Sequence, residues 1–397
     1  HYLANNTIFN HSQTGIYLKN SASLNTITAN NVHHNMKGIA VSASSQNNIS
    51  TNTLEANQLK GISIVSNSMS NIIGGNTVTL HAEAGIYIHT SDINTIHNNT
   101  LSCNGYGMHL VSCGGTGNIV SSNLIYENTN HGIYLQDSKS LVDGNNQIAE
   151  NIIYNNTGNG IYLTASKGNA LQQNTIHGNN HGVYLASSSN NELASNGIWG
   201  NSGNGIYVTN SIDNQIVENQ ISENIHSGVY LNACGRTALE NNSIYFNHKH
   251  GLHFCASSLG SSYAIQYNSM YNNTGSGVFL NESDANHFIK NNIWNNSCGI
   301  NISHSTGNEV AENNVSTNGY GIFIQHADCT GNNIWWNNFI NNTLHDDSQA
   351  YDAGNNSWFD DTHGNYWTDL GSGTYYLIPP YDVQDKYPLD SMRQWWL

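Results

Sequence analysis

The stretch Gly160-Ile-Tyr-Leu-Thr-Ala-Ser-Lys-Gly-Asn-Ala-Leu-Gln-Gln-Asn-Thr-Ile-His-Gly-Asn-Asn-His-Gly-Val-Tyr-Leu185 holds one full repeat of this chain and the start of the next. A Gly-apolar-x-apolar motif opens the repeat, and an apolar-x-x-Asn-x-apolar motif, Leu171 to Ile176, follows it. The first motif recurs from Gly15 to Gly321 at intervals of 22 to 28 residues. The apolar pieces are short and alternate with a period of two, which is typical of strands.

Three short strands in each period, separated by Asn, Gly and Ser, predict one turn of a β-helix. Asn and Gly tolerate the left-handed backbone conformations that tight corners need. A single turn cannot bury its apolar face, but stacked turns can. Because parallel crossovers are right-handed in nearly all cases, we expect an all-β, right-handed, single-stranded parallel β-helix of about 14–15 coils.

The composition changes after residue 343, which predicts a β-helix over residues 1–343 and a C-terminal cap or interaction segment over 344–397. All three prolines and four of the eight tryptophans lie in this last segment. Proline cannot donate to a ladder of strands, so stacking should end there. No comparable cap precedes the first coil, and we therefore expect that coil to be a docking edge or the result of truncation.

The Asn of the second motif recurs at one place in the coil, and we expect its side chains to stack as a structural ladder along the axis. The predicted ladder comprises Asn52, Asn76, Asn99, Asn174, Asn196, Asn219, Asn242, Asn268, Asn313 and Asn337. Contacts of these amides with sugars or a metal are the alternative interpretation.

The middle residue of the Gly-apolar-x-apolar motif should point out of the coil. Five consecutive coils carry tyrosine at this place: Tyr134, Tyr162, Tyr184, Tyr207 and Tyr230. The stripe could stiffen the sheet through aromatic pairs, each adding roughly 0.2 to 1 kcal/mol. It could also form a contact face, since tyrosine is favoured at interfaces.

The six cysteines form no CxxC pair, which argues against zinc and redox motifs. Cys234 and Cys255 fall near the same corner of adjacent coils, so we predict a disulfide between them. Cys103, Cys113, Cys298 and Cys329 have no partner by register. They are candidates for cross-links between molecules, with buried free thiols as the alternative.

The formal net charge of -16 argues against nucleic acids and anionic membrane surfaces as partners. No apolar run approaches the roughly 20 residues of a membrane-spanning helix, so membrane insertion is not expected. Several Asn-x-Ser/Thr sequons fit an extracellular glycoprotein.

An active site is not apparent in this pattern. Polysaccharide lyases, hydrolases and epimerases need paired carboxylates, or a carboxylate beside Lys or Arg. The acidic residues of the coils share no register, and no basic residue stands beside a carboxylate on a strand. The 20 histidines show no spacing typical of a metal site. We therefore expect no enzyme, no cofactor and no metal.

The repeats resemble parallel β-helix repeats of the carbohydrate-binding and sugar-hydrolase type, as in the periplasmic copper-binding NosD-like proteins. The tail is similar to the C-terminal end of surface β-helix proteins of methanogenic archaea, through Asn337–Thr343, Ala350-Tyr351-Asp352, Gly364–Asp369 and Tyr387-Pro388-Leu389. The resemblance implies an exported archaeal surface protein. Two departures argue against bound metals. The stretch Leu370–Tyr376 lacks acidic calcium ligands, and no Met or Cys/His cluster suits copper.

These features together favour a structural protein of an archaeal extracellular sheath or surface layer. Its main partner would be itself, through end-to-end stacking and lateral contacts, with cell-surface glycans as further partners. The alternative hypotheses are a carbohydrate-active enzyme of the lyase, hydrolase or epimerase type, and a carbohydrate-binding surface protein that uses the tyrosine stripe.

Overall fold

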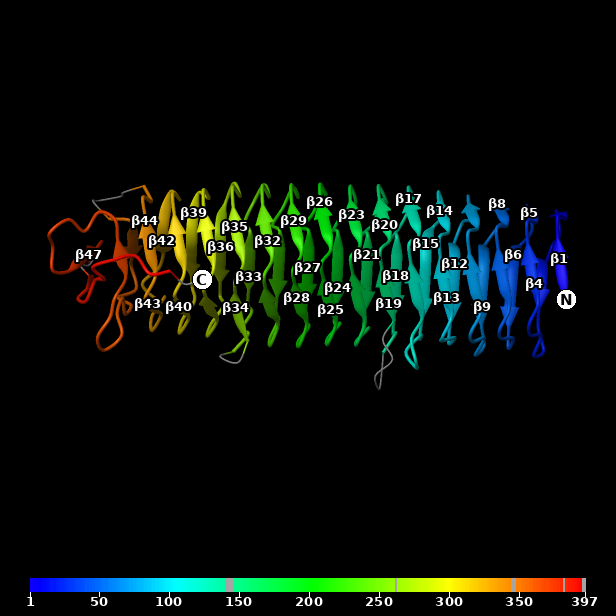
Figure 1. Ribbon diagram of the computed structural model, residues 1–397, viewed down its shortest axis with the longest axis horizontal. Coiled ribbons are helices and arrows are strands. Elements are labelled where there is room, and N and C mark those ends of the chain that lie inside the picture. The colour runs from blue at the N-terminus through cyan, green and yellow to red at the C-terminus, as the bar shows by residue number, and fades with distance from the viewer. Residues whose placement is uncertain (140–145, 261–262, 344–347, 381–382, 395–397) are drawn as a thin grey trace. The chain divides into compact units, whose positions relative to one another are not determined.

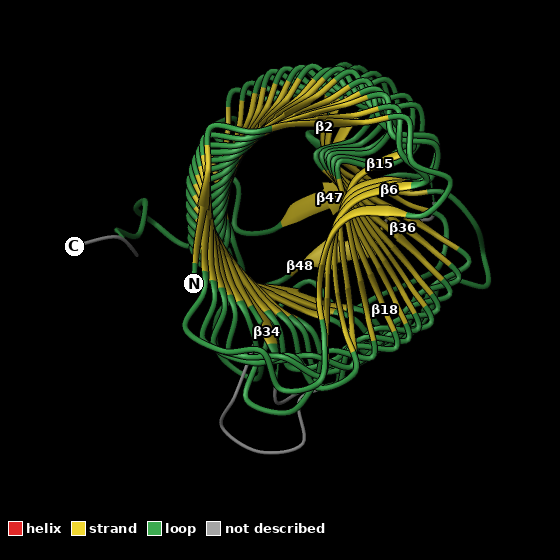
Figure 2. Ribbon diagram, turned by 90° about the vertical axis from the view of Figure 1, so that its right-hand side faces the viewer, coloured by secondary structure: helices red, strands yellow, loops and turns green. Residues whose placement is uncertain are grey.

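The computed structural model of the 397-residue chain describes residues 1–139, 146–260, 263–343, 348–380 and 383–394. The chain divides into two units, His1–Asn201 and Ser202–Leu397. Every regular element in the described residues is a strand (Figure 1). Each unit is built from coils of three short strands that pair in parallel with the strands of the next coil, and Figure 2 shows the three resulting faces. The predicted right-handed parallel β-helix is confirmed.

In the first unit, three parallel sheets follow one another around each coil. Sheet A contains β1 (Tyr2–Ala4), β4 (Thr26–Thr28), β7 (Asn48–Ser50), β10 (Ile72–Gly74), β13 (Thr95–His97), β16 (Ile119–Ser121), β19 (Gln147–Ala149), β22 (Ala170–Gln172) and β25 (Glu192–Ala194). Sheet B contains β2 (Thr7–Phe9), β5 (Asn31–His33), β8 (Thr53–Glu55), β11 (Thr77–Thr79), β14 (Thr100–Ser102), β17 (Leu124–Tyr126), β20 (Ile152–Tyr154), β23 (Thr175–His177) and β26 (Gly197–Trp199). Sheet C contains β3 (Thr14–Leu18), β6 (Lys37–Ser42), β9 (Lys60–Val65), β12 (Ala84–His89), β15 (Tyr106–Val111), β18 (Ile133–Gln136), β21 (Ile161–Thr164) and β24 (Val183–Ala186).

The second unit repeats this arrangement and ends in a different way. Its sheet A strands are β28 (Gln215–Val217), β31 (Ala238–Glu240), β34 (Ala264–Gln266), β37 (His287–Ile289), β40 (Glu309–Ala311) and β43 (Asn333–Trp335). Its sheet B strands are β29 (Gln220–Ser222), β32 (Ser243–Tyr245), β35 (Ser269–Tyr271), β38 (Asn292–Trp294), β41 (Asn314–Ser316), β44 (Asn338–Ile340) and β46 (Tyr366–Trp367). Its sheet C strands are β27 (Ile206–Thr209), β30 (Val229–Asn232), β33 (Leu252–Cys255), β36 (Ser276–Asn281), β39 (Cys298–Ser303), β42 (Tyr320–Ile324) and β45 (Ala350–Asp352).

The end of the second unit continues the coils past residue 343. Strand β45 pairs with β42, and β46 pairs with β44. The chain then forms an antiparallel hairpin from β47 (Tyr376–Ile378) and β48 (Val383–Asp385). The cap boundary at 343/344 stays a prediction, and parts of that segment, 344–347, 381–382 and 395–397, lie outside the described residues.

Alternation along each strand separates the core from the surface. In β21, Ile161 and Leu163 are fully buried, whereas Tyr162 between them is half-buried on the outer face. Ile153 and Ile176 on sheet B are likewise fully buried. Because side chains of successive strand residues point to opposite faces, every coil contributes such inward aliphatic groups to a continuous core within its unit.

Stacked amides line the corner between sheets A and B, and we call this the A–B column. It contains all ten residues of the predicted ladder, five in each unit. Asn76 shows the pattern: its N–H and Nδ2 both donate to Asn99 Oδ1, at 3.0 and 2.9 Å. Its Nδ2 also donates to Ile49 O at 2.9 Å. These bonds satisfy corner carbonyls that would otherwise be buried without a donor.

Three such amide columns reach the end of the second unit, and each ends on a carboxylate. The A–B column ends where Asn365 N–H donates to Asp385 Oδ2 at 2.7 Å. In the column between sheets C and A, Asn356 Nδ2 donates to Asp352 Oδ1 at 2.7 Å. The column between sheets B and C ends where Gln349 donates to Asp369. A carboxylate suits these ends because it only accepts hydrogen bonds, and the amides before it all donate in this direction.

One histidine interrupts the column between sheets B and C. His81 Nδ1 accepts the N–H of Asn57 at 3.1 Å, but its buried Nε2 has no hydrogen-bond partner among the described residues. Burial lowers the pKa of His81 to about 4. The ring is therefore neutral in the folded chain at neutral pH.

We expect His81→Asn to stabilise the first unit by about 1 kcal/mol, because an amide would restore the column and remove the unpaired nitrogen. The pKa of His81 lies below its unfolded value of 6.5, so folding stability is lost as pH falls from 6.5 towards 4. The gain should therefore grow over that range. Thermal unfolding of the parent and the variant at pH 7 and pH 5 measures this gain in stability. A melting temperature of the variant that is equal to or lower than that of the parent at both pH values would contradict the prediction.

The cysteine predictions need correction, because all six cysteines are free thiols. Cys234 lies inside the coil, where its N–H donates to Ser257 Oγ at 3.0 Å, so its neighbour in the next coil is Ser257. Cys255 lies two residues earlier in the coil, on the outer side of β33, opposite Asn232. The two sulfurs therefore occupy opposite sides of the backbone, and the predicted disulfide is wrong.

The predicted cross-links between molecules fail for three of the four cysteines. Cys113, Cys298 and Cys329 are buried, so their sulfurs cannot meet another folded molecule. Burial also raises the pKa of the Cys113 thiol to about 12, which keeps it protonated. Only Cys103 is exposed, on the corner after β14.

Candidate functional site

A row of aromatic side chains follows the outer face of sheet C in the first unit, and we call it the sheet C row. It consists of register partners in five consecutive coils: Tyr87, His109, Tyr134, Tyr162 and Tyr184. The Tyr134 and Tyr162 rings are stacked, with centroids 5.0 Å apart and planes 8° apart. Their ring faces cover each other, so the phenol edges face solvent. Neither hydroxyl forms a hydrogen bond with the part of the chain that the structure describes.

A second set of rings stands beside the sheet C row, just before the glycine of each motif. Tyr106 lies 5.6 Å from Tyr134, and His131 lies 4.8 Å from Tyr162, between ring centroids. His131 Nδ1 accepts the N–H of Asn159 at 2.9 Å, so its neutral ring carries the proton on Nε2. Burial lowers the pKa of His131 to about 4, which keeps the ring neutral at pH 7.

His109 occupies the second position of the row. Its Nε2 is buried without a hydrogen-bond partner among the described residues. Burial lowers its pKa, and the positive charge of Lys60 acts in the same direction. Because this nitrogen is buried, a ligand on the outer face does not reach it in this conformation. His109 stacks on Tyr134 with centroids 4.6 Å apart, which fixes its orientation.

A lysine and a glutamate lie at the N-terminal end of the sheet C row. Lys60 Nζ is 3.0 Å from Glu83 Oε2 and 3.7 Å from the centroid of the Tyr87 ring. Lys60, Glu83 and His109 come from three successive coils and influence one another electrostatically. The prediction that no basic residue stands beside a carboxylate is therefore wrong.

The second unit carries a related row on its own sheet C. Tyr207 and Tyr230 stack with centroids 5.0 Å apart, and His253 stacks on Tyr230 at 4.4 Å. His250 lies beside His253, with a pKa lowered to about 4 by burial. The five predicted stripe residues thus lie on sheet C of their units, three in the first and two in the second. Sequence reasoning did not find the flanking Tyr106, His131 and His250, because they precede the motif glycine.

A second kind of aromatic row, on sheet B, was also missed. In the first unit it contains Tyr126, Tyr154, His177 and Trp199, stacked with centroids 5.0 to 5.2 Å apart. In the second unit it contains Tyr245, Tyr271 and Trp294. All stand directly after the last apolar residue of the Asn motif, and aligning the repeats at that place would have found them.

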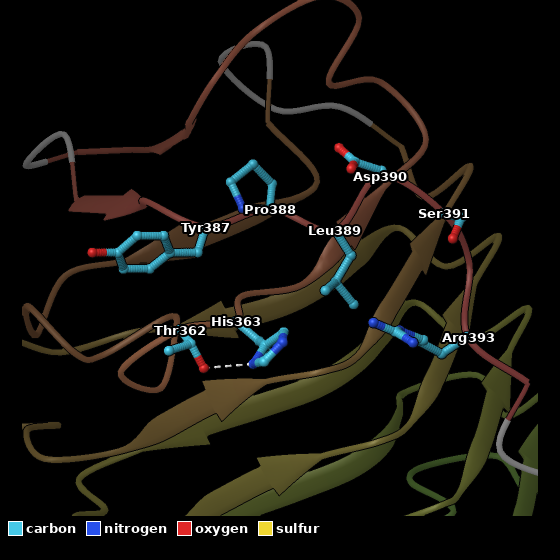
Figure 3. A pocket seen from close by; sticks show the side chains of 8 residues that line it. All are labelled: Thr362, His363, Tyr387, Pro388, Leu389, Asp390, Ser391 and Arg393. Atoms are coloured by element: carbon cyan, nitrogen blue, oxygen red, sulfur yellow. Dashed lines mark hydrogen bonds between the residues drawn. The ribbon is translucent and has the colours of Figure 1, made fainter.

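The C-terminal region forms a further pocket of about 380 Å³, shown in Figure 3. Its lining includes His363, Tyr387, Asp390 and Arg393. His363 Nδ1 lies 2.7 Å from Thr362 Oγ1, and the backbone of Arg393 exchanges two hydrogen bonds with the Asn338 side chain. The lining mixes both charge signs and carries no aligned set of groups, so it is a weaker candidate than the sheet C row.

Metal ligands do not gather in the described residues, where no group of three His, Cys, Asp or Glu side chains could hold a metal ion. Two histidine–carboxylate pairs lie in the second unit: His287 Nδ1 is 2.6 Å from Glu309 Oε2, and His304 Nδ1 is 2.7 Å from Asp328 Oδ2. Two ligands of this kind do not fit a copper site. No described helix is long and apolar enough to cross a membrane.

Comparison with known proteins gives two family matches. The family model of a right handed beta helix region matches residues 2–148 and 115–262. The model of the periplasmic copper-binding protein NosD matches residues 258–372, where no group of three described His, Cys, Asp or Glu side chains could hold a metal ion. A search of curated proteins found no match.

Three solved structures are similar to this chain. The A-module of the mannuronan C-5 epimerase AlgE4 of Azotobacter vinelandii is 18% identical, with a TM-score of 0.49 over 70% of this chain and 86% of that chain. The Dettilon tailspike protein gp208 is 14% identical, with a TM-score of 0.54 over 74% of this chain and 62% of that chain. The periplasmic alginate epimerase AlgG is 13% identical, with a TM-score of 0.41 over 77% of each chain. At these identities the likeness shows the fold alone.

The prediction that the chain is not an enzyme is contradicted on its own ground, because it assumed that no basic residue stands beside a carboxylate, whereas Lys60 Nζ lies 3.0 Å from Glu83 Oε2. The prediction relied on the scattered carboxylates of the coils. The structure shows why this was insufficient: Lys60, Glu83 and His109 are brought together from three coils, although their spacing in sequence groups none of them.

Proposed function

Because the chain belongs to the family of right handed beta helix regions, we propose that it binds an extended polysaccharide along sheet C of residues 1–201. The observation that carries this proposal is the sheet C row, with one outward ring in each of five coils. The row offers hydrogen-bonding groups at intervals of about 4.8 Å, the spacing of neighbouring strands. A polymer that repeats its hydroxyl groups can meet such a surface at several places at once.

The chemistry of the row suits a carbohydrate. Each phenol can donate and accept, and the His131 Nε2–H adds one donor. The alternative ligand with a regular repeat, a nucleic acid, is disfavoured by the net charge of -16. The expected assembly of the chain with itself into an archaeal sheath or surface layer stays a prediction.

The test removes hydroxyls without disturbing the stack. In the double variant Tyr134→Phe/Tyr162→Phe, affinity for a bound polysaccharide should fall about tenfold, or about 1.4 kcal/mol, since each hydrogen bond contributes roughly 0.5–1.5 kcal/mol. Isothermal titration calorimetry against polygalacturonate and a neutral polymer, dextran, measures it.

The matched control is Tyr126→Phe/Tyr154→Phe on sheet B of the same unit, where the rings are stacked 5.1 Å apart with planes 6° apart. This control should bind like the parent. Equal losses in both double variants, or no binding by the parent chain, would overturn the proposal.

A second candidate function, modification of the bound polymer, is favoured by Lys60 and Glu83, which meet beside Tyr87 at the N-terminal end of the sheet C row. A carboxylate such as that of Glu83 can take a proton from the carbon next to a uronate carboxylate, and the ammonium group of Lys60 stabilises the charge that develops there. If the bond from the adjacent carbon to the glycosidic oxygen then breaks and that oxygen takes up the proton, an unsaturated sugar is left. Return of a proton to the opposite face of the carbon leaves an epimer instead. Product analysis of the same incubations decides it, because an unchanged polymer excludes this candidate.

A further inference from the structure

The two coils before the sheet C row carry small side chains at the outward position that the row fills with aromatic rings. Tyr17, Ala40, Ser63 and Tyr87 are successive register partners on β3, β6, β9 and β12. Ala40 and Ser63 are buried, so the surface is hollowed between the two tyrosines. These tyrosines stand three coils apart, or about 14 Å at 4.8 Å per coil. We call the resulting hollow, of about 270 Å³, the notch.

The notch carries positive charge in an otherwise acidic chain. Lys37 and Lys60, partners on β6 and β9, both line it, and they are two of only 10 basic residues in the sequence. No acidic side chain is part of its lining. Residues 1–60 contain three lysines and one acidic residue, Glu55, which lies on sheet B.

The two lysines differ in how they are held. Lys60 is fixed between Glu83 and the Tyr87 ring, with only 19% of its side chain exposed. These two partners leave part of its three-donor ammonium group free for a ligand. Lys37 has no ion-pair partner among the described residues. One anchored and one unpaired ammonium group at neighbouring positions suit a ligand that carries negative charge.

The remaining lining provides neutral hydrogen-bonding groups and an aromatic wall. Gln13, Thr14, Ser42 and Ser63 offer donors and acceptors around the lysines. Tyr17 is 52% exposed, and the small Ala40 beside it leaves one of its ring faces uncovered. From His109 to Tyr184 the ring faces of the sheet C row cover one another, so the notch differs from that part of the row in both charge and shape.

We propose that the notch is the subsite that selects an anionic substituent, a carboxylate or a sulfate, on the polysaccharide bound along sheet C. This inference rests on the proposed function, since Tyr87 is both a wall of the notch and the first member of the row. The row would hold the polymer through its hydroxyl groups, and the notch would discriminate acidic from neutral sugars.

The experiment compares ligands that differ only in charge. The probes are a hexamer of galacturonic acid and its methyl ester, and a sulfated galactan oligomer with its desulfated form, each titrated by calorimetry at low salt. The parent chain should bind the acidic member of one pair at least tenfold more tightly, and the pair concerned identifies carboxylate or sulfate as the group selected.

The variant Lys37→Gln/Lys60→Gln should lose this preference and still bind the neutral members. The charge-matched control is Lys139→Gln/Lys167→Gln, which removes two exposed lysines from neighbouring coils of the same unit. That control should keep the preference. If both double variants lose the preference for acidic oligomers, the preference depends on the overall charge of the chain and not on the notch, and the inference is overturned.

The outcomes separate this inference from the proposed function. If the parent binds acidic and neutral members equally, or if the notch variant keeps its preference, the notch is not the selective subsite while polysaccharide binding stands. If the parent binds none of the four oligomers and neither polymer, the proposed function fails as well. Circular dichroism of each variant confirms that the fold is intact before titration.

Discussion

Replacement of Gly205 by valine is expected to destabilise the second unit by at least about 3 kcal/mol, enough to remove much of its folding stability. A Cβ atom at this position would lie 2.5 Å from Ile221 Cγ2 and 2.7 Å from Gly228 O. The backbone cannot move away freely, because Gly228 O accepts the N–H of Ile206 at 2.9 Å. Urea unfolding followed by circular dichroism measures the change.

The cause of this effect is a lack of space, since Gly205 does not have a left-handed backbone. Gly205→Ala should therefore be damaging too, because the first added carbon already makes the close contacts. The control is Gln215→Val, on the exposed outer side of β28, where a branched residue suits a strand. If Gly205→Val unfolds at the same urea concentration as the parent, the close approach of the two backbones is wrong.

The fold could be predicted because one repeat is copied many times. Glycine spacing gives the coil length, and alternation gives the inner and outer faces. The left-handed corners were expected at asparagines and glycines. Many are formed by the residue before an A–B column Asn, which is an asparagine at Asn98 but another residue at Thr51 and Ser122. The motif glycines instead allow neighbouring coils to approach each other closely, because a Cβ atom there would meet the next coil.

The candidate site was harder to predict, because its residues belong to different coils and different places in the repeat. Lys60 precedes its motif glycine by one residue and Glu83 by two, whereas His109 follows its own by two. Because the three residues stand at different distances in sequence from their motif glycines, aligning the repeats on the glycine does not show that they lie close together in space. The same counting paired Cys234 with Cys255, although the next-coil neighbour of Cys234 is Ser257.

Replacement of Asn99 by aspartate is expected to destabilise the first unit by at least about 3 kcal/mol, although the two side chains have nearly the same shape. Asn99 Nδ2 donates to three oxygens: Ile73 O at 2.9 Å, His97 O at 3.0 Å and Asn123 Oδ1 at 3.0 Å. An aspartate would place an oxygen against these three oxygens in a buried corner. Urea unfolding at pH 7 measures the loss.

The adjacent residue provides a matched control. Asn98 is exposed, so Asn98→Asp should change stability little, although it adds the same charge one residue away. Part of the loss in Asn99→Asp should be recovered at acidic pH, because a protonated carboxyl regains one donor. A variant as stable as the parent at pH 7 would show that the columns do not hold the coils together. Asp385, at the end of the A–B column in the second unit, is a buried aspartate that the fold accommodates. Its carboxylate accepts hydrogen bonds from the N–H groups of Asn365, Trp367 and Tyr387, and no neighbouring oxygen needs a donor from it.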